Sequence, residues 1–415
     1  MTEEMIERAV PRSRKGNYTQ ERLLQAAEQT FGELGYHDAS VAEICRRAGV
    51  AHGTFYRYFA GKEEIFIRLI EGFGKRLRAQ IDTAMEAAET SIDKLLAGYR
   101  SILEFIGRYV ALYNVLREAE FLQMGIHRRF HSDIAAPLQQ ALEEGMARGE
   151  FRPVDLDTVS YALLGIVEFI ALRYLIWEQN GLDEGVLRTI DELVLHGIDT
   201  GQPLHPPKDT GRTSEKASPV TPAVPQGGEA TRQALLNAAE RLFGEAGFYE
   251  TRISSITYVA GVAQGTFYLY FPNKVAVFAE LIREINERFR MEERRAISGL
   301  ADRREIEREG FRAFFQFISR HRGAYRIVRE AEFVDEAVGR WYYQRLAAGY
   351  MRGLQRGMEQ GEIRRLDPEV LAYSLLGMGH LVGLRQLFIE GHDEMPASVL
   401  EALLDFIMHG LLLPA

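Results

Sequence analysis

The sequence predicts an all-α protein made of two tandem units, each with a three-helix N-terminal region followed by a longer helical body. Residues 19–62 align without a gap with residues 231–274 at a constant offset of 212, and 22 of the 44 aligned positions are identical. Apolar residues recur at helical spacing in both units, and no alternating period indicates a strand. The period is far longer than that of a solenoid repeat, so we expect two complete folding units.

Composition and charge exclude several classes of protein. The 415 residues are 46% apolar and 26% charged, which is typical of a globular chain. A single cysteine, Cys45, excludes an internal disulfide and a cysteine metal cluster. The acidic first residues do not resemble a secretion signal, and no continuous apolar stretch is long enough to span a bilayer. We expect a soluble cytoplasmic protein without a membrane partner.

A proline-rich segment separates the two units. Six of the thirteen prolines lie between residues 203 and 225, where helical periodicity stops. Later matches extend the repeat into the bodies: Arg117–Phe121 recurs as Arg329–Phe333, and Tyr161–Gly165 as Tyr373–Gly377. The predicted domains are a basic N-terminal arm (1–17), a first helix–turn–helix domain (18–64), a first helical body (65–200), a linker (201–228), a second helix–turn–helix domain (229–276) and a second helical body (277–415).

Local signals place the helices of the first N-terminal region. Thr19 is expected to cap a first helix that ends at Gly35. The capping-box pattern Ser40-Val-Ala-Glu43 predicts the start of a second helix, which ends before Gly49. A third helix is expected over residues 52–59, and a fourth from Lys62. The second and third helices together form a helix–turn–helix, whose last helix enters the major groove of DNA.

Spacing sorts the residues of the third helix. Phe55 and Phe59 are four residues apart and are expected to anchor the helix in the core, whereas His52 and Tyr56 share a different, exposed face. His52 is placed to read a base edge, and the predicted phosphate contacts are Thr54, Tyr56, Arg57 and Lys62. A basic arm ahead of the fold, formed by Arg12, Arg14 and Lys15, is expected to follow the minor groove or the backbone.

At this point the sequence resembles the TetR family of bacterial transcriptional regulators. The resemblance lies in SVAEICRRAGVAHGTFYRYFAGK, residues 40–62, and in RISSITYVAGVAQGTFYLYFPNK, residues 252–274. It implies three N-terminal helices that bind DNA and a divergent helical body that binds a small effector and dimerises through its last two helices. The candidate DNA contacts are Ser40, His52, Gly53, Thr54, Tyr56, Arg57, Tyr58 and Lys62 in the first copy, and Gln264, Gly265, Thr266, Tyr268, Tyr270 and Lys274 in the second.

The second copy departs from the first at the positions that would face DNA. Leu269 stands in place of Arg57, Tyr258 and Val259 in place of Arg46 and Arg47, Arg252 in place of Ser40, and Ser255 in place of Glu43. Thr251 is an alternative cap for the second helix of this copy. Residues 8–62 carry nine basic and five acidic side chains, whereas residues 220–274 carry four of each, within a chain of net charge −9. We expect the first copy to bind DNA; the second either reads a different base or completes the fold as a structural half.

Effector contacts are harder to predict from the sequence. Arginine and aromatic residues within apolar helices could contact a ligand, form an internal ion pair or belong to the core. Glu168 aligns with His380, so two pockets at these places would differ in charge. The candidates are Tyr113, Arg117, Glu120, Tyr161 and Glu168 in the first body, Tyr325, Arg329, Glu332, Tyr373 and His380 in the second, and Trp177 as a further aromatic residue.

The last two helices of each body, expected at residues 157–178, 184–198, 368–390 and 397–412, are strongly apolar and need a second pair to form a four-helix bundle. The halves can pair within one chain as a pseudo-dimer, or each can pair with its copy in a homodimer of chains. No catalytic, metal or cofactor motif appears, and His127 and His131 are expected on a solvated helix face. The sequence thus predicts a non-enzymatic, ligand-responsive repressor that binds double-stranded operator DNA. The alternative is a ligand sensor or adaptor in which one or both helix–turn–helix units no longer bind DNA.

Overall fold

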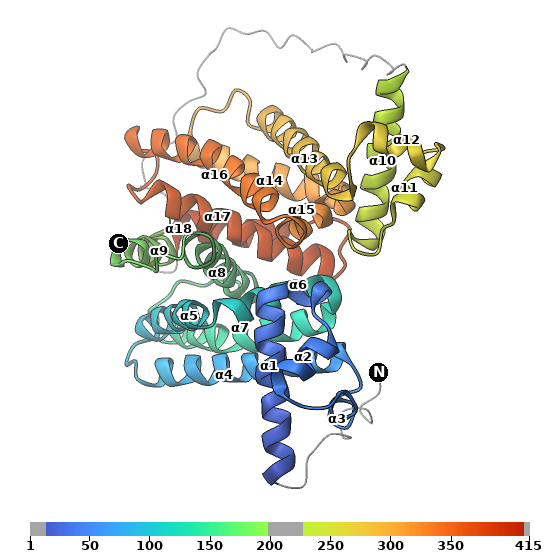
Figure 1. The fold of residues 1–415 in the computed structure, drawn as a ribbon. Helices are drawn as coiled ribbons and strands as arrows, with labels where there is room; N and C mark the ends of the chain where they lie inside the picture. The colour runs from blue at the N-terminus through green and yellow to red at the C-terminus, as the bar shows by residue number, and fades with distance from the viewer. Residues whose placement is uncertain (1–13, 198–226, 411–415) are drawn as a thin grey trace. The chain divides into compact units, whose positions relative to one another are not determined.

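The computed structural model describes residues 14–197 and 227–410, and the elements of regular structure in these ranges are helices (Figure 1). The all-α prediction is confirmed. In the first repeat the helices are α1 (Arg14–Asp38), α2 (Val41–Ala48), α3 (His52–Phe55), α4 (Lys62–Glu86), α5 (Ser91–Arg108), α6 (Val110–Leu122), α7 (Met124–Ala147), α8 (Leu156–Ile170), the π-helical η3 (Ala171–Trp177) and α9 (Glu184–His196). In the second they are α10 (Gly228–Ala246), α11 (Ile253–Val259), α12 (Gln264–Tyr270), α13 (Lys274–Ala296), α14 (Arg303–Arg320), α15 (Arg322–Val334), α16 (Glu336–Glu359), α17 (Pro368–Gly383), η4 (Leu384–Ile389) and α18 (Ala397–His409).

The duplication extends to the helix boundaries. Helices α13, α14, α15, α16 and α17 begin at the residues that align with the first residues of α4, α5, α6, α7 and α8, respectively, at the constant offset of the repeat. Helix α18 begins one residue later than this offset from α9 gives, because one residue is inserted in the loop before it. Both repeats therefore contain the same succession of helices.

Two helix boundaries differ from the sequence prediction. Helix α1 begins at Arg14, so Thr19 lies inside it and is not its cap, and the proposed basic arm overlaps the helix at Arg14 and Lys15. Helix α3 ends at Phe55 rather than Phe59, since the N–H groups of Arg57 and Tyr58 bond three residues back to Thr54 and Phe55, as in a turn. Gly35 ends the regular part of α1 as predicted, with φ of 72°. Residues 1–13 and most of the linker lie outside the described ranges.

The described chain forms two compact units that do not divide at the linker. The first contains residues 14–148 and 174–181; the second contains residues 149–173, 182–197 and 227–410. Helices α8 and α9 of the first repeat therefore belong to the same unit as the whole second repeat.

In the first unit, α4, α5 and α7 pack together to form a body with an aromatic centre. The ring of Phe73 on α4 lies 5.1 Å from that of Phe105 on α5 and 5.9 Å from that of Phe130 on α7. Helix α1 packs against α6 of the same unit, which connects the three-helix N-terminal region to this body.

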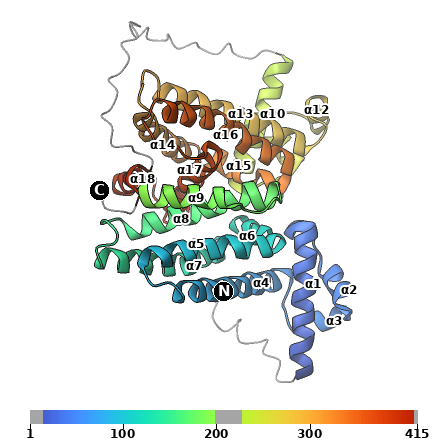
Figure 2. The same cartoon turned by 90° about the vertical axis from the view of Figure 1, so that its left-hand side faces the viewer.

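In the second unit, α8 and α17 pack closely against each other, α9 contacts α17, and α18 contacts α8. Figure 2 shows these four helices grouped together. Glycines permit the closest approach. A Cβ atom on Gly165 of α8 would lie 2.2 Å from the carbonyl oxygen of Gly377 on α17, and a Cβ on Gly377 would lie 2.0 Å from that of Gly165. Gly197 and Gly410, which follow α9 and α18, approach the opposite helix end in the same way. These four positions exclude larger side chains.

Charged contacts across this bundle also occur in equivalent pairs. The Arg173 guanidinium bonds to Glu369 (Nε–Oε1 2.9 Å). Arg385, the counterpart of Arg173 in the second repeat, pairs with Asp157, the counterpart of Glu369 (Nη2–Oδ1 3.5 Å). Arg385 also lies over the ring of Tyr161 at 4.8 Å, and Arg173 over the ring of Tyr373 at 5.8 Å. The two helical pairs thus contact one another through the same residues on both sides.

One apolar segment is longer than the sequence analysis allowed. Residues Leu156–Trp177, which form α8 and η3, are long and apolar enough to cross a membrane by length and composition, contrary to our expectation. In the folded chain, 78% of the most apolar window is buried. Its apolar character is accounted for by its place in the bundle, where α8 packs against other helices on several sides.

Candidate nucleic-acid interface and effector cavity

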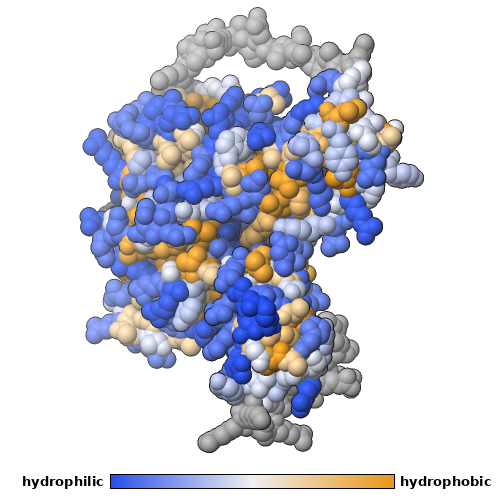
Figure 3. Space-filling model, viewed as in Figure 1, coloured by the Kyte–Doolittle hydropathy of each residue, from blue (hydrophilic) through white to orange (hydrophobic). Residues whose placement is uncertain are grey.

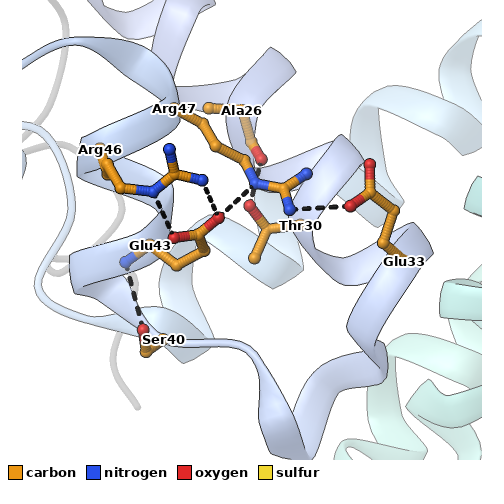
Figure 4. A network of polar contacts seen from close by, with 7 residues as sticks. All are labelled: Ala26, Thr30, Glu33, Ser40, Glu43, Arg46 and Arg47. Carbon is orange, nitrogen blue, oxygen red and sulfur yellow. Dashed lines mark hydrogen bonds and ion pairs between the residues drawn. The ribbon is translucent and has the colours of Figure 1, made fainter.

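The first head, which we define as α1 to α3, holds its second helix by caps at both ends. The Ser40 hydroxyl oxygen accepts the backbone N–H of Glu43 (3.1 Å), as predicted, and Gly49 ends α2 in the left-handed conformation. The Glu43 carboxylate accepts hydrogen bonds from Arg46 and Arg47, and Arg47 also reaches Glu33 on α1 (2.7 Å; Figure 4). Hydrogen bonds from Arg46 and then Arg47 lower the pKa of Glu43 to about 2. This network neutralises part of the basic charge of α2.

The third helix presents the residues that spacing predicted to be exposed. Phe55 and Phe59 are buried, with ring centroids 5.6 Å apart. His52 and Tyr56 lie outside with ring centroids 5.3 Å apart, and Gly53 and Arg57 are exposed beside them, while Thr54 and Tyr58 are half-buried. This surface carries hydrogen-bond donors of a kind that contacts bases and phosphates. Contact of these side chains with DNA stays a prediction.

Two lysines among the candidate DNA contacts, Lys62 and Lys274, make hydrogen bonds within their own heads. Lys62 Nζ donates to the carbonyl oxygens of Tyr36 (2.8 Å) and Ala39 (3.0 Å) and lies 4.3 Å from the ring centroid of Tyr36. Lys274 Nζ donates to the carbonyls of Phe248 (2.6 Å) and Thr251 (2.8 Å). Burial lowers the pKa of both ammonium groups. Because their donors face backbone carbonyls, both lysines fix the loop between the first two helices of their head.

The second head, α10 to α12, has the same shape and a different surface. Gln264, Gly265 and Tyr268 are exposed, and Thr266 and Tyr270 are half-buried, like their counterparts. Leu269 is 80% and Tyr258 86% exposed, and hydrophobic colour is visible over this head in Figure 3. The suggested cap at Thr251 is wrong: its hydroxyl donates to the Gly247 carbonyl (2.7 Å), and Arg252 precedes α11 without a capping side chain.

A carboxylate, half-buried in the first repeat and buried in the second, joins each head to the helical body behind it. Glu118 on α6 accepts the backbone N–H of Tyr36 (2.6 Å), next to Gly35. Glu330 on α15 accepts the N–H of Phe248 (3.0 Å), next to Gly247, in the same manner. Both lie within the repeated Arg-Glu-Ala-Glu-Phe run. Sequence reasoning singled out the arginine and the second glutamate of this run and missed the first glutamate, although its presence in both copies was a usable signal.

The candidate effector residues do not form one site. Tyr113 and Trp177 are buried and Arg117 and Glu120 half-buried in the first unit. Tyr161 and Tyr373 contact the arginines of the bundle described above. His127 and His131 are both 4% exposed, with ring centroids 4.2 Å apart, so the solvated face expected for them is wrong.

Three candidates of the second body do lie together. The Tyr325 hydroxyl is 2.8 Å from His380 Nδ1, and Arg329 lies 5.1 Å from the Tyr325 ring centroid. Burial lowers the pKa of Arg329 to about 10. Phe169 from α8 contacts the His380 ring at 5.2 Å, and the half-buried Glu168 beside it raises the pKa of Tyr325 as a minor cause after burial. Glu332 lies elsewhere, against Gly339. The cluster links the bundle to the second body.

A cavity of about 650 Å³ lies within the second body, between α13, α14, α16 and α17. Its lining includes Arg290 and Glu293 of α13, Arg303 and Glu307 of α14, and Tyr350 of α16. The residues predicted for this body are not in the lining. Sequence reasoning missed the cavity because charged residues on an amphipathic helix usually form its solvated face.

Two heads that each present a helix–turn–helix, joined to all-helical bodies, define the class of helix–turn–helix regulators. Residues 23–69 and 235–281 match the model of bacterial regulatory proteins of the tetR family. The uncharacterized HTH-type transcriptional regulator YdgC of Bacillus subtilis is 29% identical over 163 residues, which cover 39% of this chain and 84% of YdgC. The HTH-type transcriptional repressor KstR2 of Mycobacterium tuberculosis is 27% identical over 159 residues, 37% of this chain and 78% of KstR2.

Among solved structures, the transcriptional regulator FadR of Bacillus subtilis in complex with stearoyl-CoA is 23% identical with a TM-score of 0.39, and the match covers 42% of this chain and 96% of FadR. Each of these matches covers most of the relative and less than half of the present chain. The chain is a TetR-family transcriptional regulator in tandem duplication.

Proposed function

We propose that the chain is a cytoplasmic repressor that binds operator DNA as a single-chain pseudo-dimer and leaves it when a small molecule binds a helical body. KstR2, one of its relatives, is a transcriptional repressor. The duplicated heads supply two DNA-reading elements, which helix–turn–helix proteins usually obtain by dimerisation.

The reciprocal contacts of the bundle carry this proposal. In a two-fold dimer, residue i of one subunit contacts residue j of the other, and j contacts i. The pairs Arg173–Glu369 and Arg385–Asp157 have this pattern between equivalent positions of the two repeats, within one chain. The backbones of Gly165 and Gly377 show the same reciprocal pattern, because each glycine lies against the carbonyl group of the other. These contacts support the second repeat as the partner of the first.

The hydrogen bonds of Glu118 and Glu330 support the proposal that ligand binding in a body changes the position of its head. Glu118 and Glu330 bond to the backbone of their heads from α6 and α15, helices that belong to the bodies. A ligand that shifts either helix would therefore displace a hydrogen bond at the base of a head.

The proposal is tested by selecting DNA from a random pool with the purified full chain at low salt. We expect an enriched site with two unlike halves, because the exposed residues of the heads differ, and native mass spectrometry should show one 47.1 kDa chain per site. Two chains on a symmetric site would overturn the pseudo-dimer. If no sequence is enriched, the repressor proposal fails.

One observation favours the alternative, in which the second head no longer reads DNA. Leu269, Tyr258 and Val259 are exposed where the first head has arginines. An exposed apolar surface is unfavourable for phosphate contact and is more typical of protein contacts. Footprinting separates the two cases: protection of one half-site only would favour the alternative.

A further inference from the structure

We propose that the cavity of the second body is the effector site of the chain, and that it takes an amphiphile with an apolar chain and an anionic head. The first body, in contrast, is a packed counterpart without this chemistry. The effect of such a ligand on DNA binding rests on the proposed function, whereas binding itself does not.

Apolar side chains and open backbone form the inner part of the cavity. The apolar lining residues include Phe289, Ile306, Phe311, Phe314, Leu346 and Leu375. A Cβ atom on Gly310 or Gly349 would meet no atom within 4 Å, so both glycines face open space. A volume near 650 Å³ lies in the range of roughly 300–1,000 Å³ typical of small-molecule sites.

The lining of the cavity contains more basic than acidic side chains, and one of the acidic side chains is already paired within the protein. Five arginines (Arg290, Arg294, Arg303, Arg352 and Arg356) stand against three glutamates (Glu293, Glu307 and Glu359). The Glu307 carboxylate is already paired within the protein, since it accepts hydrogen bonds from Arg303 Nε (2.6 Å) and from the Tyr350 hydroxyl. Gly353 and Gly357 of α16 leave the space through which the Arg303 side chain passes.

The remaining arginines form a cationic rim. Arg290 is half-buried, and its pKa is lowered first by burial and then by the like charges of Arg345, Arg294 and Arg352. Burial and the nearby Glu307 raise the pKa of Glu293, which favours its neutral form and weakens its opposition to an anion. An anionic head group at this rim would relieve the repulsion between arginines and accept their hydrogen bonds. A carboxylate and a phosphate share this chemistry.

The first repeat provides an internal comparison. Glu293, Glu307 and Tyr350 correspond to Ile81, Leu95 and Leu138, which have no exposed surface. Gly98, the counterpart of the open Gly310, is packed by Leu138 and Met85, whose atoms would lie 3.0 and 3.1 Å from a Cβ. The rim residues Arg294, Arg352 and Arg356 correspond to Asp82, Gln140 and Glu144. The polar cavity is therefore particular to the second repeat.

This comparison implies that the two repeats have different functions, DNA binding in the first and ligand binding in the second. The first head has Arg46, Arg47 and Arg57, whereas the second head has other residues at all three positions. The second body has the cationic cavity, whereas the residues of the first body that match Glu293, Glu307 and Tyr350 are apolar and buried. Ligand binding in the second repeat would affect the first repeat through the contact between α17 and α8.

Binding to the purified full chain tests the proposal, measured by isothermal titration calorimetry below the critical micelle concentration of each probe. Four probes share a ten-carbon tail: decanoate, decyl phosphate, decan-1-ol and decyltrimethylammonium. We expect either or both anions to bind at least about tenfold more tightly than the alcohol, and the cation to bind more weakly than the alcohol. Equal binding of all four, or preference for the cation, would overturn the anionic site.

Three variants locate the site. Arg290→Met should weaken anion binding about tenfold without changing binding of the alcohol, and its first-repeat counterpart Arg78→Met should change neither. Gly310→Leu fills open space on a helix and should abolish binding of every probe without lowering Tm. Retained binding in Gly310→Leu, or an equal loss in Arg78→Met, places the ligand elsewhere and overturns the assignment. Anion binding that leaves a DNA complex unaffected would contradict the repressor function and not this site.

Discussion

At the scale of single residues, the carboxylates that join heads to bodies are the groups most sensitive to their surroundings. Burial is the largest cause that raises the pKa of Glu118, to about 7, and the charges of Arg117, Lys62 and Asp38 act on it as well. A glutamate in the unfolded chain titrates near 4.5. The folded protein therefore holds a proton on Glu118 that the unfolded chain releases between these two pH values.

The sign of the pH dependence follows from this raised pKa. Stability contributed by the protonated Glu118 is fully present below pH 4.5 and is lost as pH rises through about 7. We expect Tm to fall by a few degrees between pH 5.5 and 8.5, and Glu118→Gln, which stays neutral, to reduce that fall. Scanning fluorimetry of the full chain measures Tm at each pH, and Glu104→Gln, at an exposed position, is the control. Identical profiles in wild type and Glu118→Gln would contradict this assignment.

Lys62 gives a second prediction at this scale. Lys62→Met removes hydrogen bonds to three backbone carbonyls and should lower the free energy of unfolding by about 1–3 kcal/mol in urea titrations. Arg57→Ala, at an exposed position of the same head, should stay within about 0.5 kcal/mol of wild type. An unchanged stability of Lys62→Met together with weaker DNA binding would restore the phosphate contact first expected for this lysine.

At the scale of elements, α3 and α12 offer a comparison between two copies of one recognition helix. Replacing Leu269 of α12 by arginine restores the charge of Arg57 at an 80% exposed position. We expect Leu269→Arg to tighten DNA binding and to steepen the slope of log K against log salt by about 1, since one more phosphate is neutralised. Gel-shift titrations at several salt concentrations measure this slope. Leu269→Ala removes the apolar side chain without adding charge, so an equal gain there would exclude a phosphate contact.

The sequence predicted the end of a helix correctly where a single capping side chain or a single glycine determines that end. Helix α2 begins after Ser40, whose hydroxyl accepts a free backbone N–H group, and ends at Gly49, which adopts the left-handed conformation. Both signals act within a few residues of the helix end. Thr19 carries the same kind of local signal, yet α1 continues through it back to Arg14. A local signal of this kind permits a boundary and does not require one.

The sites were less predictable because their chemistry depends on which helices meet. Nothing local distinguishes Tyr161, whose ring lies under Arg385 of the bundle, from an aromatic residue that lines a ligand site. Arg290 and Glu293 follow the pattern of a solvated face, yet α14 and α16 enclose them around a cavity. The fold class follows from periodicity and repetition, whereas the position of the cavity follows from packing across distant parts of the chain.

At the scale of the whole molecule, the proposed pseudo-dimer would make an interface between subunits part of one folded unit. Helices α8 and α9 belong to the unit that contains the second repeat. Closing the interface within one chain removes its dependence on protein concentration and allows the two sides to diverge. Divergence then requires that the contacts holding the halves together be kept, as the pairs Arg173–Glu369 and Arg385–Asp157 are.

Charge reversal tests that requirement. Arg173→Glu sets two carboxylates against each other where Arg173 Nη2 and Glu369 Oε1 are now 2.8 Å apart, and it should lower the free energy of unfolding by on the order of 1–3 kcal/mol. Adding Glu369→Arg should recover much of the loss, because the pair is rebuilt with its charges exchanged, and a double-mutant cycle in urea isolates that coupling. The exposed Arg188→Glu on α9 controls for net charge. If the double variant is no more stable than Arg173→Glu, the pair does not hold the halves together, and the glycine contacts between α8 and α17 must do so without it.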